Sequence, residues 1–173
     1  MPKNPYLFDL AKSKPVVKKP FGTVQGAYDK VFPVVTGQQA AMFLVVLKPG
    51  GIREPHWHPT AWEFDYCIGG QARMSVVAPN NEWKIFDVAP GQIVFVPQGY
   101  FHYFENTGKD DLRFLVVFND STSEADDDIG ISVSLGGVPR HVLAATFGVH
   151  EKVFHKVPKL HKEVVITGPA PGK

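Results

Sequence analysis

Short apolar runs separated by turn residues dominate the central part of this chain. The turns are rich in glycine, proline and asparagine, whereas valine, isoleucine, phenylalanine and tyrosine fill most of the runs. Such residues favour pleated, half-buried strands, and short strands at regular intervals are typical of a β-sandwich or barrel. The pattern therefore predicts an all-β fold with strands in seven ranges: Ala41–Lys48, Phe64–Ile68, Arg73–Ala78, Trp83–Val88, Gln92–Val96, His102–Glu105 and Leu112–Asn119. The aromatic residues predicted to pack in the core of this fold are Phe64, Tyr66, Phe95, Phe104, Phe114 and Phe118.

Three segments depart from the strand pattern. Residues 1–20 are basic and interrupted by prolines, which predicts an arm that lies on the barrel or on a partner. Residues 119–128 are polar and acidic, which predicts a surface loop that can move. The first convincing helical pattern covers residues 138–160, where Pro139 suits a first helical turn and Gly148 suits a C-terminal cap.

The length of 173 residues fits one domain. We therefore predict a single domain over residues 1–173. Its parts are an N-terminal arm (1–20), a β-barrel core (21–136) and a helical C-terminal tail (137–173), and a further short strand is expected at Val164–Thr167.

Composition excludes several classes of protein. Hydrophobic residues make up 44% of the chain and charged residues 20%, which excludes a disordered protein. The net charge of +1 is too small for a dedicated nucleic-acid binder. The one cysteine, Cys67, cannot form an intramolecular disulfide or a cysteine-based zinc site. No apolar stretch is long enough to span a membrane, and the first residues do not resemble a signal peptide, so we expect a cytoplasmic protein without a membrane or nucleic-acid partner.

Two segments carry residues that suggest chemistry. His56 and His58 are two positions apart, so in a strand both side chains point to one face. Glu63 follows a short turn and can reach the same point from the neighbouring strand, and His102 begins a later strand after a Pro-x-Gly turn. An isolated His-x-His in a proline-rich loop is usually an ordinary surface feature. Here three imidazoles and a carboxylate could converge inside a barrel, and such a set suits Mn, Fe, Co, Ni, Cu or Zn.

The spacing of these residues matches both signature motifs of the cupin superfamily at every fixed position. The first motif runs from Gly50 through His56, His58 and Glu63 to Gly70, and the second runs from Gly91 through Pro97, Gly99 and His102 to Asn106. The sequence therefore resembles a cupin, which implies a double-stranded β-helix, a small jelly-roll-like barrel. The resemblance also implies one metal ion per chain, held by His56, His58, Glu63 and His102.

Within the superfamily, the stretch around Arg53 looks like the oxalate decarboxylase family, in which an arginine sits three residues before the first histidine ligand. The similarity extends to residues 4–15, 114–120 and 139–149. It implies that manganese is the metal and that Arg53 holds a small carboxylate substrate. Strict strand alternation places Arg53 on the face opposite His56 unless Pro55 breaks the register, so a surface arginine paired with Glu54 is the alternative.

In the same family, a lid loop that contains Ser-Glu follows the last metal-ligand strand, and its glutamate is the proton donor. Ser123 and Glu124 fall in the matching loop of this chain, although the following residues differ from the family pattern. The resemblance thus implies that Glu124, or one of Asp126–Asp128, is a general acid. The alternative is a solvated acidic loop, which is what most runs of charge are.

The resemblance implies an enzyme that uses dioxygen and breaks the C–C bond of oxalate or a similar small carboxylate. With a competent acid the products are carbon dioxide and formate, and without one they are carbon dioxide and hydrogen peroxide. Two alternatives stay open: a dioxygenase or isomerase that acts on a larger substrate, and a non-catalytic metal-binding or storage cupin. We also expect a homo-oligomer, either a dimer or a hexamer, because relatives of this size pair through an N-terminal arm and a helical tail.

Overall fold

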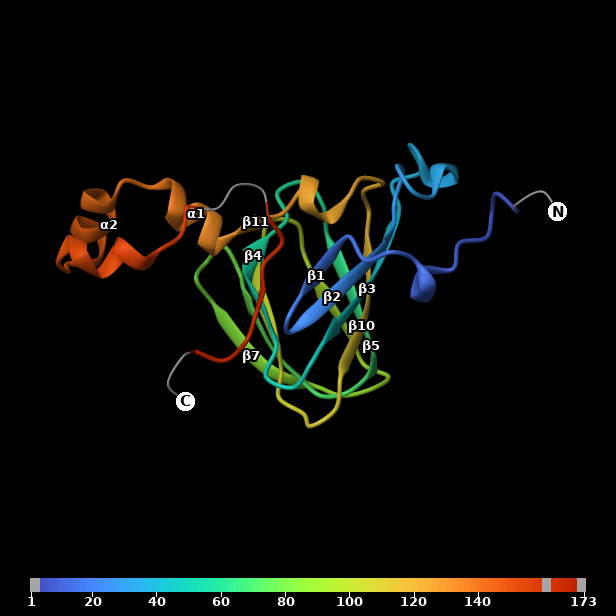
Figure 1. The fold of residues 1–173 in the computed structure, drawn as a ribbon, viewed down its shortest axis with the longest axis horizontal. Coiled ribbons are helices and arrows are strands. Elements are labelled where there is room, and N and C mark those ends of the chain that lie inside the picture. The colour runs from blue at the N-terminus through green and yellow to red at the C-terminus, as the bar shows by residue number, and fades with distance from the viewer. Residues whose placement is uncertain (1–3, 160–162, 171–173) are drawn as a thin grey trace.

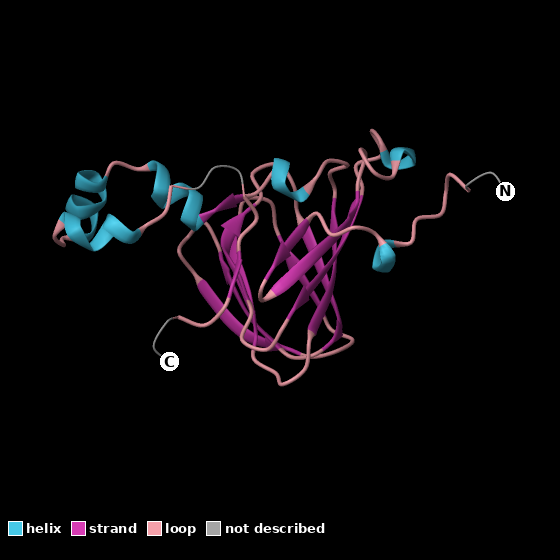
Figure 2. Ribbon diagram, viewed as in Figure 1, coloured by secondary structure: helices cyan, strands magenta, loops and turns pink. Residues whose placement is uncertain are grey.

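The computed structural model describes residues 4–159 and 163–170, and it consists of two antiparallel sheets that face each other (Figures 1 and 2). The first sheet has the strand order β1 (Val17–Lys19), β2 (Gly22–Ala27), β3 (Ala41–Leu47), β10 (Leu112–Phe118), β5 (Glu63–Gly69) and β8 (Ile93–Val96). The second has the order β11 (Ile129–Gly130), β4 (Ile52–Trp57), β9 (Phe101–Asn106), β6 (Ala72–Val77) and β7 (Trp83–Val88), and β12 (Ile166–Thr167) also pairs with β4. The predicted all-β barrel is confirmed.

All seven predicted strands are present, and no end differs by more than one residue. The sequence pattern missed β2 because two glycines interrupt its apolar residues. Both glycines pack against β3 so closely that a Cβ would overlap the carbonyl oxygen of Val46 at Gly22 and the ring of Phe43 at Gly26. Because glycine has no side chain at these two positions, β2 can lie this close to β3.

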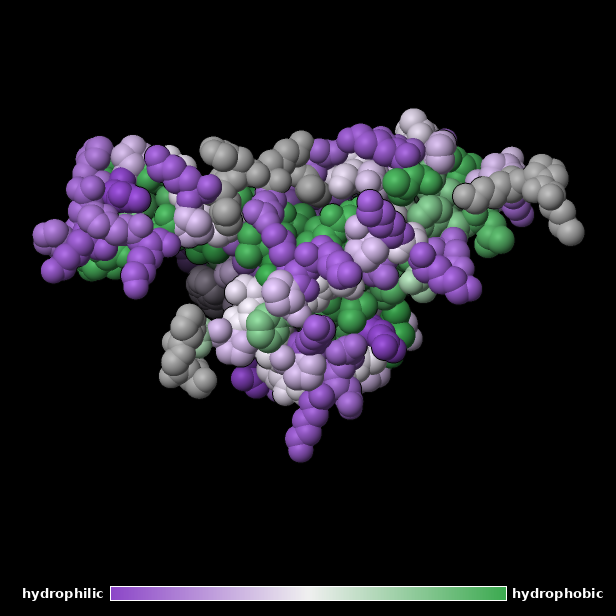
Figure 3. All heavy atoms as spheres, in the orientation of Figure 1, coloured by the Kyte–Doolittle hydropathy of each residue, from purple (hydrophilic) through white to green (hydrophobic). Residues whose placement is uncertain are grey.

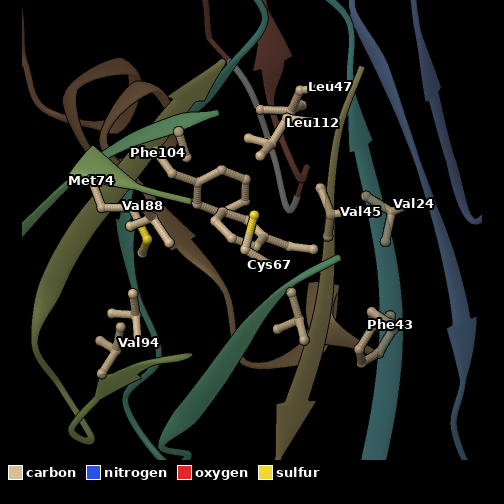
Figure 4. Close-up of a cluster of buried hydrophobic side chains, with 14 of the residues drawn as sticks. Val24, Phe43, Val45, Leu47, Cys67, Met74, Val88, Val94, Phe104 and Leu112 are labelled. Carbon is tan, nitrogen blue, oxygen red and sulfur yellow. The ribbon is translucent and has the colours of Figure 1, made fainter. Parts of the chain in front are cut away.

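Alternation along the strands fills the space between the sheets with apolar side chains, many of which Figure 4 shows. Phe104, Phe114 and Phe118 are buried there, as predicted. The prediction is wrong for Phe64, Tyr66 and Phe95, which are 40%, 42% and 47% exposed. Because Glu63 points inward at the start of β5, alternation turns Phe64 and Tyr66 to the outer face, and Phe95 lies beside Phe64 on β8.

Short helices flank the barrel. The described α-helices are α1 (Ile131–Gly137) and α2 (Arg140–Phe147), and the 3₁₀ turns are η1 (Leu10–Lys12), η2 (Pro33–Val35), η3 (Glu124–Asp126) and η4 (Glu151–Lys156). The expectation of no helix before residue 138 is wrong, because α1 begins seven residues earlier. Pro139 is the N-cap residue of α2, one position before the first helical turn in which it was expected. Gly148 is the C-terminal cap, as predicted, with a φ of 65°.

The helices α1 and α2 lie on the opposite side of the barrel from the N-terminal segment (Figure 1). Part of the predicted arm is a strand, since β1 pairs with β2. Residues 1–3 of the arm and residues 160–162 and 171–173 of the tail lie outside the described residues. Within the described parts of the chain, no helix combines the length and the hydropathy that a membrane crossing requires.

Asn106, the last residue of the second motif, ties three chain segments together at the end of β9. Its Nδ2 donates to the carbonyl oxygens of Leu47 and Asp110 at 2.9 and 2.8 Å, and its Oδ1 accepts from the backbone N–H of Gly108 at 2.9 Å. The side chain is buried, so each of these groups would lose free energy without its partner. The motif asparagine therefore fixes the turn between β9 and β10.

We predict that Asn106→Asp lowers the free energy of unfolding by about 3 kcal/mol at neutral pH, because it removes two donors and buries a charge beside two carbonyl oxygens. Urea denaturation measures the change. Asn80→Asp is the matched control, since Asn80 is exposed and its Oδ1 accepts from the Glu82 N–H, which aspartate preserves. Equal effects of the two substitutions would contradict this role for Asn106.

Candidate metal centre

Four side chains converge at one end of the barrel interior: His56, His58, Glu63 and His102. Each offers one ligand atom, and these atoms all lie within 4.8 Å of one another. All four residues are buried. The structure thus brings together the complete set of residues that the two sequence segments suggested.

Both sheets contribute to this cluster. His56 on β4 and His102 on β9 are directly opposite each other across one strand pair, with ring centroids 4.1 Å apart. His58 follows the end of β4. Glu63 begins β5, which belongs to the other sheet, so the expectation that it reaches the site from a strand neighbouring β4 is wrong. The carboxylate instead faces the imidazoles across the barrel.

Backbone carbonyl groups orient the three imidazoles. The Nδ1 atoms of His56, His58 and His102 lie 2.7, 3.1 and 3.0 Å from the carbonyl oxygens of Glu54, Asp127 and Tyr100. A carbonyl oxygen can only accept, so each neutral ring carries its proton on Nδ1 and keeps the Nε2 lone pair free. Nε2 of His58 and Nε2 of His102 are each 3.1 Å from the same Oε2 of Glu63.

Electrostatics favours a neutral imidazole at His56 and an ionised carboxylate at Glu63. Burial, together with the nearby charge of Arg53, holds the pKa of His56 well below its usual value. Burial opposes the charge of Glu63, but His102 and His58 overcome this effect and lower the pKa of Glu63. Burial also opposes a charge on His58, and the contact with Glu63 raises its pKa, so a metal ion would displace that proton. Three imidazole nitrogens and one carboxylate oxygen fit a divalent transition-metal ion.

Arg53 also points into the barrel, because β4 contains a bulge. Arg53 pairs with Phe104 of β9 and His56 pairs with His102, so two residues on β4, Glu54 and Pro55, face the single residue Tyr103 on β9. The register shift lies at Glu54 and Pro55. It places Arg53 and His56 on the same face of β4, although they are three positions apart. The side chain of Arg53 is 1% exposed, which excludes the alternative of a surface arginine.

The acidic loop 119–128 folds over the site and pairs with Arg53. The Nη2 atom of Arg53 lies 3.2 Å from Oε1 of Glu124 and 2.6 Å from Oδ1 of Asp128. The same Asp128 oxygen is 4.0 Å from Nε2 of His56. Glu124 is buried in η3, so the alternative of a fully solvated loop is wrong.

Little space remains beneath this loop. The cavity between Glu124, His58 and Phe118 measures about 10 Å³, which is at the lower limit for one water molecule. Oε2 of Glu124 and Oδ2 of Asp128 are buried without a hydrogen-bond partner among the described residues. Burial raises the pKa of Glu124, and attraction to Arg53 offsets only part of this effect. The described conformation is therefore closed, and one carboxylate oxygen each of Glu124 and Asp128 has no hydrogen-bond partner among the described residues.

Sequence reasoning missed two buried acids beside the cluster. Asp65 lies two residues after Glu63 and faces the same interior, and burial and the charge of Glu63 raise its pKa well above the ordinary value. Glu54 accepts a 3.0 Å hydrogen bond from the N–H of Ser132 at the start of α1, and burial raises its pKa. Strand alternation from Glu63 could have identified Asp65, whereas the bulge hid Glu54.

Known proteins support the identity of this fold and site. The cupin family model matches residues 8–155. The chain is 36% identical over 116 residues to an oxalate decarboxylase of Bacillus subtilis (strain 168), which covers 67% of this chain and 29% of that protein. It is 32% identical to a probable oxalate decarboxylase of Arthroderma benhamiae, over 92% of this chain and 39% of the relative.

A solved structure agrees with these sequence matches. The Bacillus subtilis oxalate decarboxylase, studied for its Mn(II) centres, aligns with a TM-score of 0.82 and 28% identity over 94% of this chain and 41% of the other. The present chain thus spans well under half the length of these relatives. The family match, which covers most of the 173 residues, places the chain in a defined family: it belongs to the cupins.

Proposed function

We propose that this cupin binds one manganese ion through His56, His58, Glu63 and His102 and acts on oxalate or a similarly small carboxylate. The observation that carries the proposal is the buried pair of Arg53 and Glu124 beside the four-ligand cluster. Similarity to oxalate decarboxylases, one of which contains Mn(II) centres, supports the same choice of metal and substrate.

The bound metal would supply a Lewis-acidic position for one substrate carboxylate and a redox partner for dioxygen. Arg53 would hold the second carboxylate by charge-assisted hydrogen bonds, which a planar guanidinium forms with both oxygens of a carboxylate. In the closed conformation Nη2 already contacts Glu124 and Asp128, whereas Nη1 has no hydrogen-bond partner among the described residues, so a carboxylate that binds both nitrogens must replace at least one of the Nη2 contacts. Loop 119–128 therefore has to open before substrate enters and can then close to exclude water.

Glu124 would deliver the proton that completes the reaction. Oxalate dianion and one proton give formate and carbon dioxide, with the proton placed on carbon as the C–C bond is lost. If no acid protonates the carbon, oxalate gives two electrons to dioxygen, which also takes up two protons. The products are then two molecules of carbon dioxide and one of hydrogen peroxide. The unpaired Oε2 of Glu124 and its raised pKa suit a donor that is protonated at mildly acidic pH.

We predict that manganese-loaded protein releases formate from oxalate in air, and that Glu124→Gln reduces the formate rate by about 10²–10⁴-fold. Manganese content should stay unchanged, because Glu124 is outside the ligand set. Asp126→Asn is the comparison, since it tests the alternative acid on the same 3₁₀ turn, a carboxylate that pairs with Lys30 at 3.4 Å. Formate, carbon dioxide and peroxide are quantified together. Unchanged formate from the glutamine variant would contradict the assignment, and no product from metal-loaded wild type would contradict the choice of oxalate.

The raised pKa of Glu124 sets the direction of the pH dependence. The acid is protonated below its pKa and ionised above it, so formation of formate should fall as pH rises through a value above the ordinary 4.5 of glutamic acid. Formate rates measured from about pH 4 to 7 test this, with circular dichroism to confirm that the fold is intact. A wild-type profile that is flat across this range would exclude Glu124 as the titrating donor.

Arg53 and Asp128 should have opposite effects on substrate binding. Arg53→Lys keeps the charge but loses the planar fork, so the oxalate dissociation constant should rise by about tenfold or more. Asp128→Asn removes the carboxylate that competes for the guanidinium at 2.6 Å and should lower the same constant. Oxalate titrations followed by the electron paramagnetic resonance of bound Mn(II) measure both. Weaker binding by both variants would show that Asp128 supports the substrate site instead of competing for it.

A further inference from the structure

The carboxylate of Glu54 has no role in the reaction proposed above, although it is buried close to the metal centre. Glu54 lies at the bulge of β4, between Arg53 and His56, and the residue is 4% exposed. Its side chain contacts the chain that follows loop 119–128, where Oε2 accepts a 3.0 Å hydrogen bond from the N–H of Ser132. A buried carboxylate costs free energy unless its contacts compensate for the loss of water, so this contact needs a structural reason.

Gly130, the second residue of β11, leaves room for this carboxylate. Apart from its chain neighbours, the three heavy atoms nearest to the position of a Cβ at Gly130 all belong to the Glu54 carboxylate, and the Cδ atom would be 2.6 Å away. The backbone itself does not require glycine, because its φ of −78° and ψ of 152° are values that any residue adopts. The position of the Glu54 carboxylate therefore explains why residue 130 has no side chain.

This contact lies two residues from an acid that pairs with Arg53. Asp128, whose Oδ1 is 2.6 Å from Nη2 of Arg53, is the last residue of loop 119–128, and β11 begins at the next residue. A residue spans at most about 3.6 Å of extended chain, so Asp128 stays within about 7 Å of Gly130. Holding Gly130 and Ser132 in place therefore limits where the carboxylate of Asp128 can go when the loop moves.

The backbone of Glu54 is itself held on two sides. Its carbonyl oxygen is 2.7 Å from Nδ1 of His56, and its N–H donates to the carbonyl oxygen of Val165 at 3.2 Å. Val165 comes directly before β12, which pairs with Ile52 and Arg53 of β4. Glu54 cannot shift without disturbing both His56 and the pairing of β4 with β12, so it is a fixed support for the loop.

The outer side of loop 119–128 is held by contacts that water can replace. The N–H of Thr60 lies 3.1 Å from both carboxylate oxygens of Asp127, and Thr60 is exposed. Hydrophilic residues gather at the end of the barrel that this loop covers (Figure 3). Segments held by solvent-exposed hydrogen bonds open at low free-energy cost. The loop can thus open at its outer side while the end next to Glu54 stays in place.

We infer that Glu54 is a positioning residue for loop closure, because its carboxylate holds residues 130–132 in place. Asp128 and Glu124 therefore return to Arg53 each time the loop closes. The effect of this support on catalysis rests on the proposed function. The support itself does not, because it consists of contacts within the chain and can be measured without oxalate.

Hydrogen–deuterium exchange of the protein without oxalate, at a measured metal content, tests this support. In the closed loop the N–H groups of Thr122, Asp126 and Asp127 donate hydrogen bonds. Glu54→Ala should speed exchange in residues 119–130 about tenfold or more, because it removes a hydrogen bond to a charged group. Glu54→Gln retains an acceptor oxygen with the same reach and should stay within about threefold of wild type. Exchange in β6 and β7 should not change in either variant.

Gly130 and Gly137 provide a matched pair of alanine substitutions in the segment after the loop. Gly130→Ala would overlap the Glu54 carboxylate and should speed exchange of the loop about tenfold or more. A Cβ at Gly137 meets no other part of the chain within 4 Å, so Gly137→Ala should have no effect. Glu54→Ala removes the overlap, and in that background Gly130→Ala should add less than about twofold. Circular dichroism confirms folding, and the two alanine substitutions test the inference alone if Glu54→Ala does not fold.

Three results would overturn the inference: equal loop exchange in wild type and Glu54→Ala, equal effects of the two alanine substitutions, or additive effects of Gly130→Ala and Glu54→Ala. The products from oxalate separate it from the proposed function. If oxalate is the substrate, Glu54→Ala should shift the products from formate toward peroxide at unchanged manganese content, because Glu124 is no longer held near Arg53. If wild type forms no product from oxalate while the exchange results are as expected, the proposed function fails and the role of Glu54 stands.

Discussion

The interior of this barrel is organised by the need to pair buried charge. Arg53 is almost completely buried, and a guanidinium in that position is stable only with anionic partners. Glu124 and Asp128 supply them from loop 119–128, which is thereby drawn over the end of the barrel. Glu63 has no arginine or lysine partner among the described residues, and its Oε2 lies 3.1 Å from Nε2 of both His58 and His102. A divalent cation at the three Nε2 atoms would provide the charge that the Glu63 carboxylate lacks.

Under the proposed function, one loop would serve both substrate entry and chemistry. The carboxylates that pair with Arg53 are chemically similar to the substrate that we propose, so loop closure and substrate binding use the same guanidinium. Exchange of one carboxylate for another at Arg53 would leave the guanidinium paired, whether the loop or the substrate supplies the anion. The cost is that a closed loop excludes substrate, since the remaining cavity measures only about 10 Å³.

Spacing in the sequence predicted the ligand cluster because His56, His102 and Glu63 depend on regular strands and short turns. Arg53 could not be placed in this way: alternation assigns it to the outside, and only the bulge at Glu54 and Pro55 turns it inward. The acidic loop was equally ambiguous, because a run of aspartates is usually solvated, and burial of Glu124 depends on a guanidinium 71 residues away. Long-range pairing of this kind leaves no periodic signal in the sequence.

The misplacement of Phe64, Tyr66 and Phe95 has a different cause. Hydrophobicity alone assigns an aromatic residue to the core, but Glu63 fixes the alternation of β5, so these side chains must point away from the metal cluster. One strand thus carries Glu63 and Asp65 on its inner face and Phe64 and Tyr66 on its outer face.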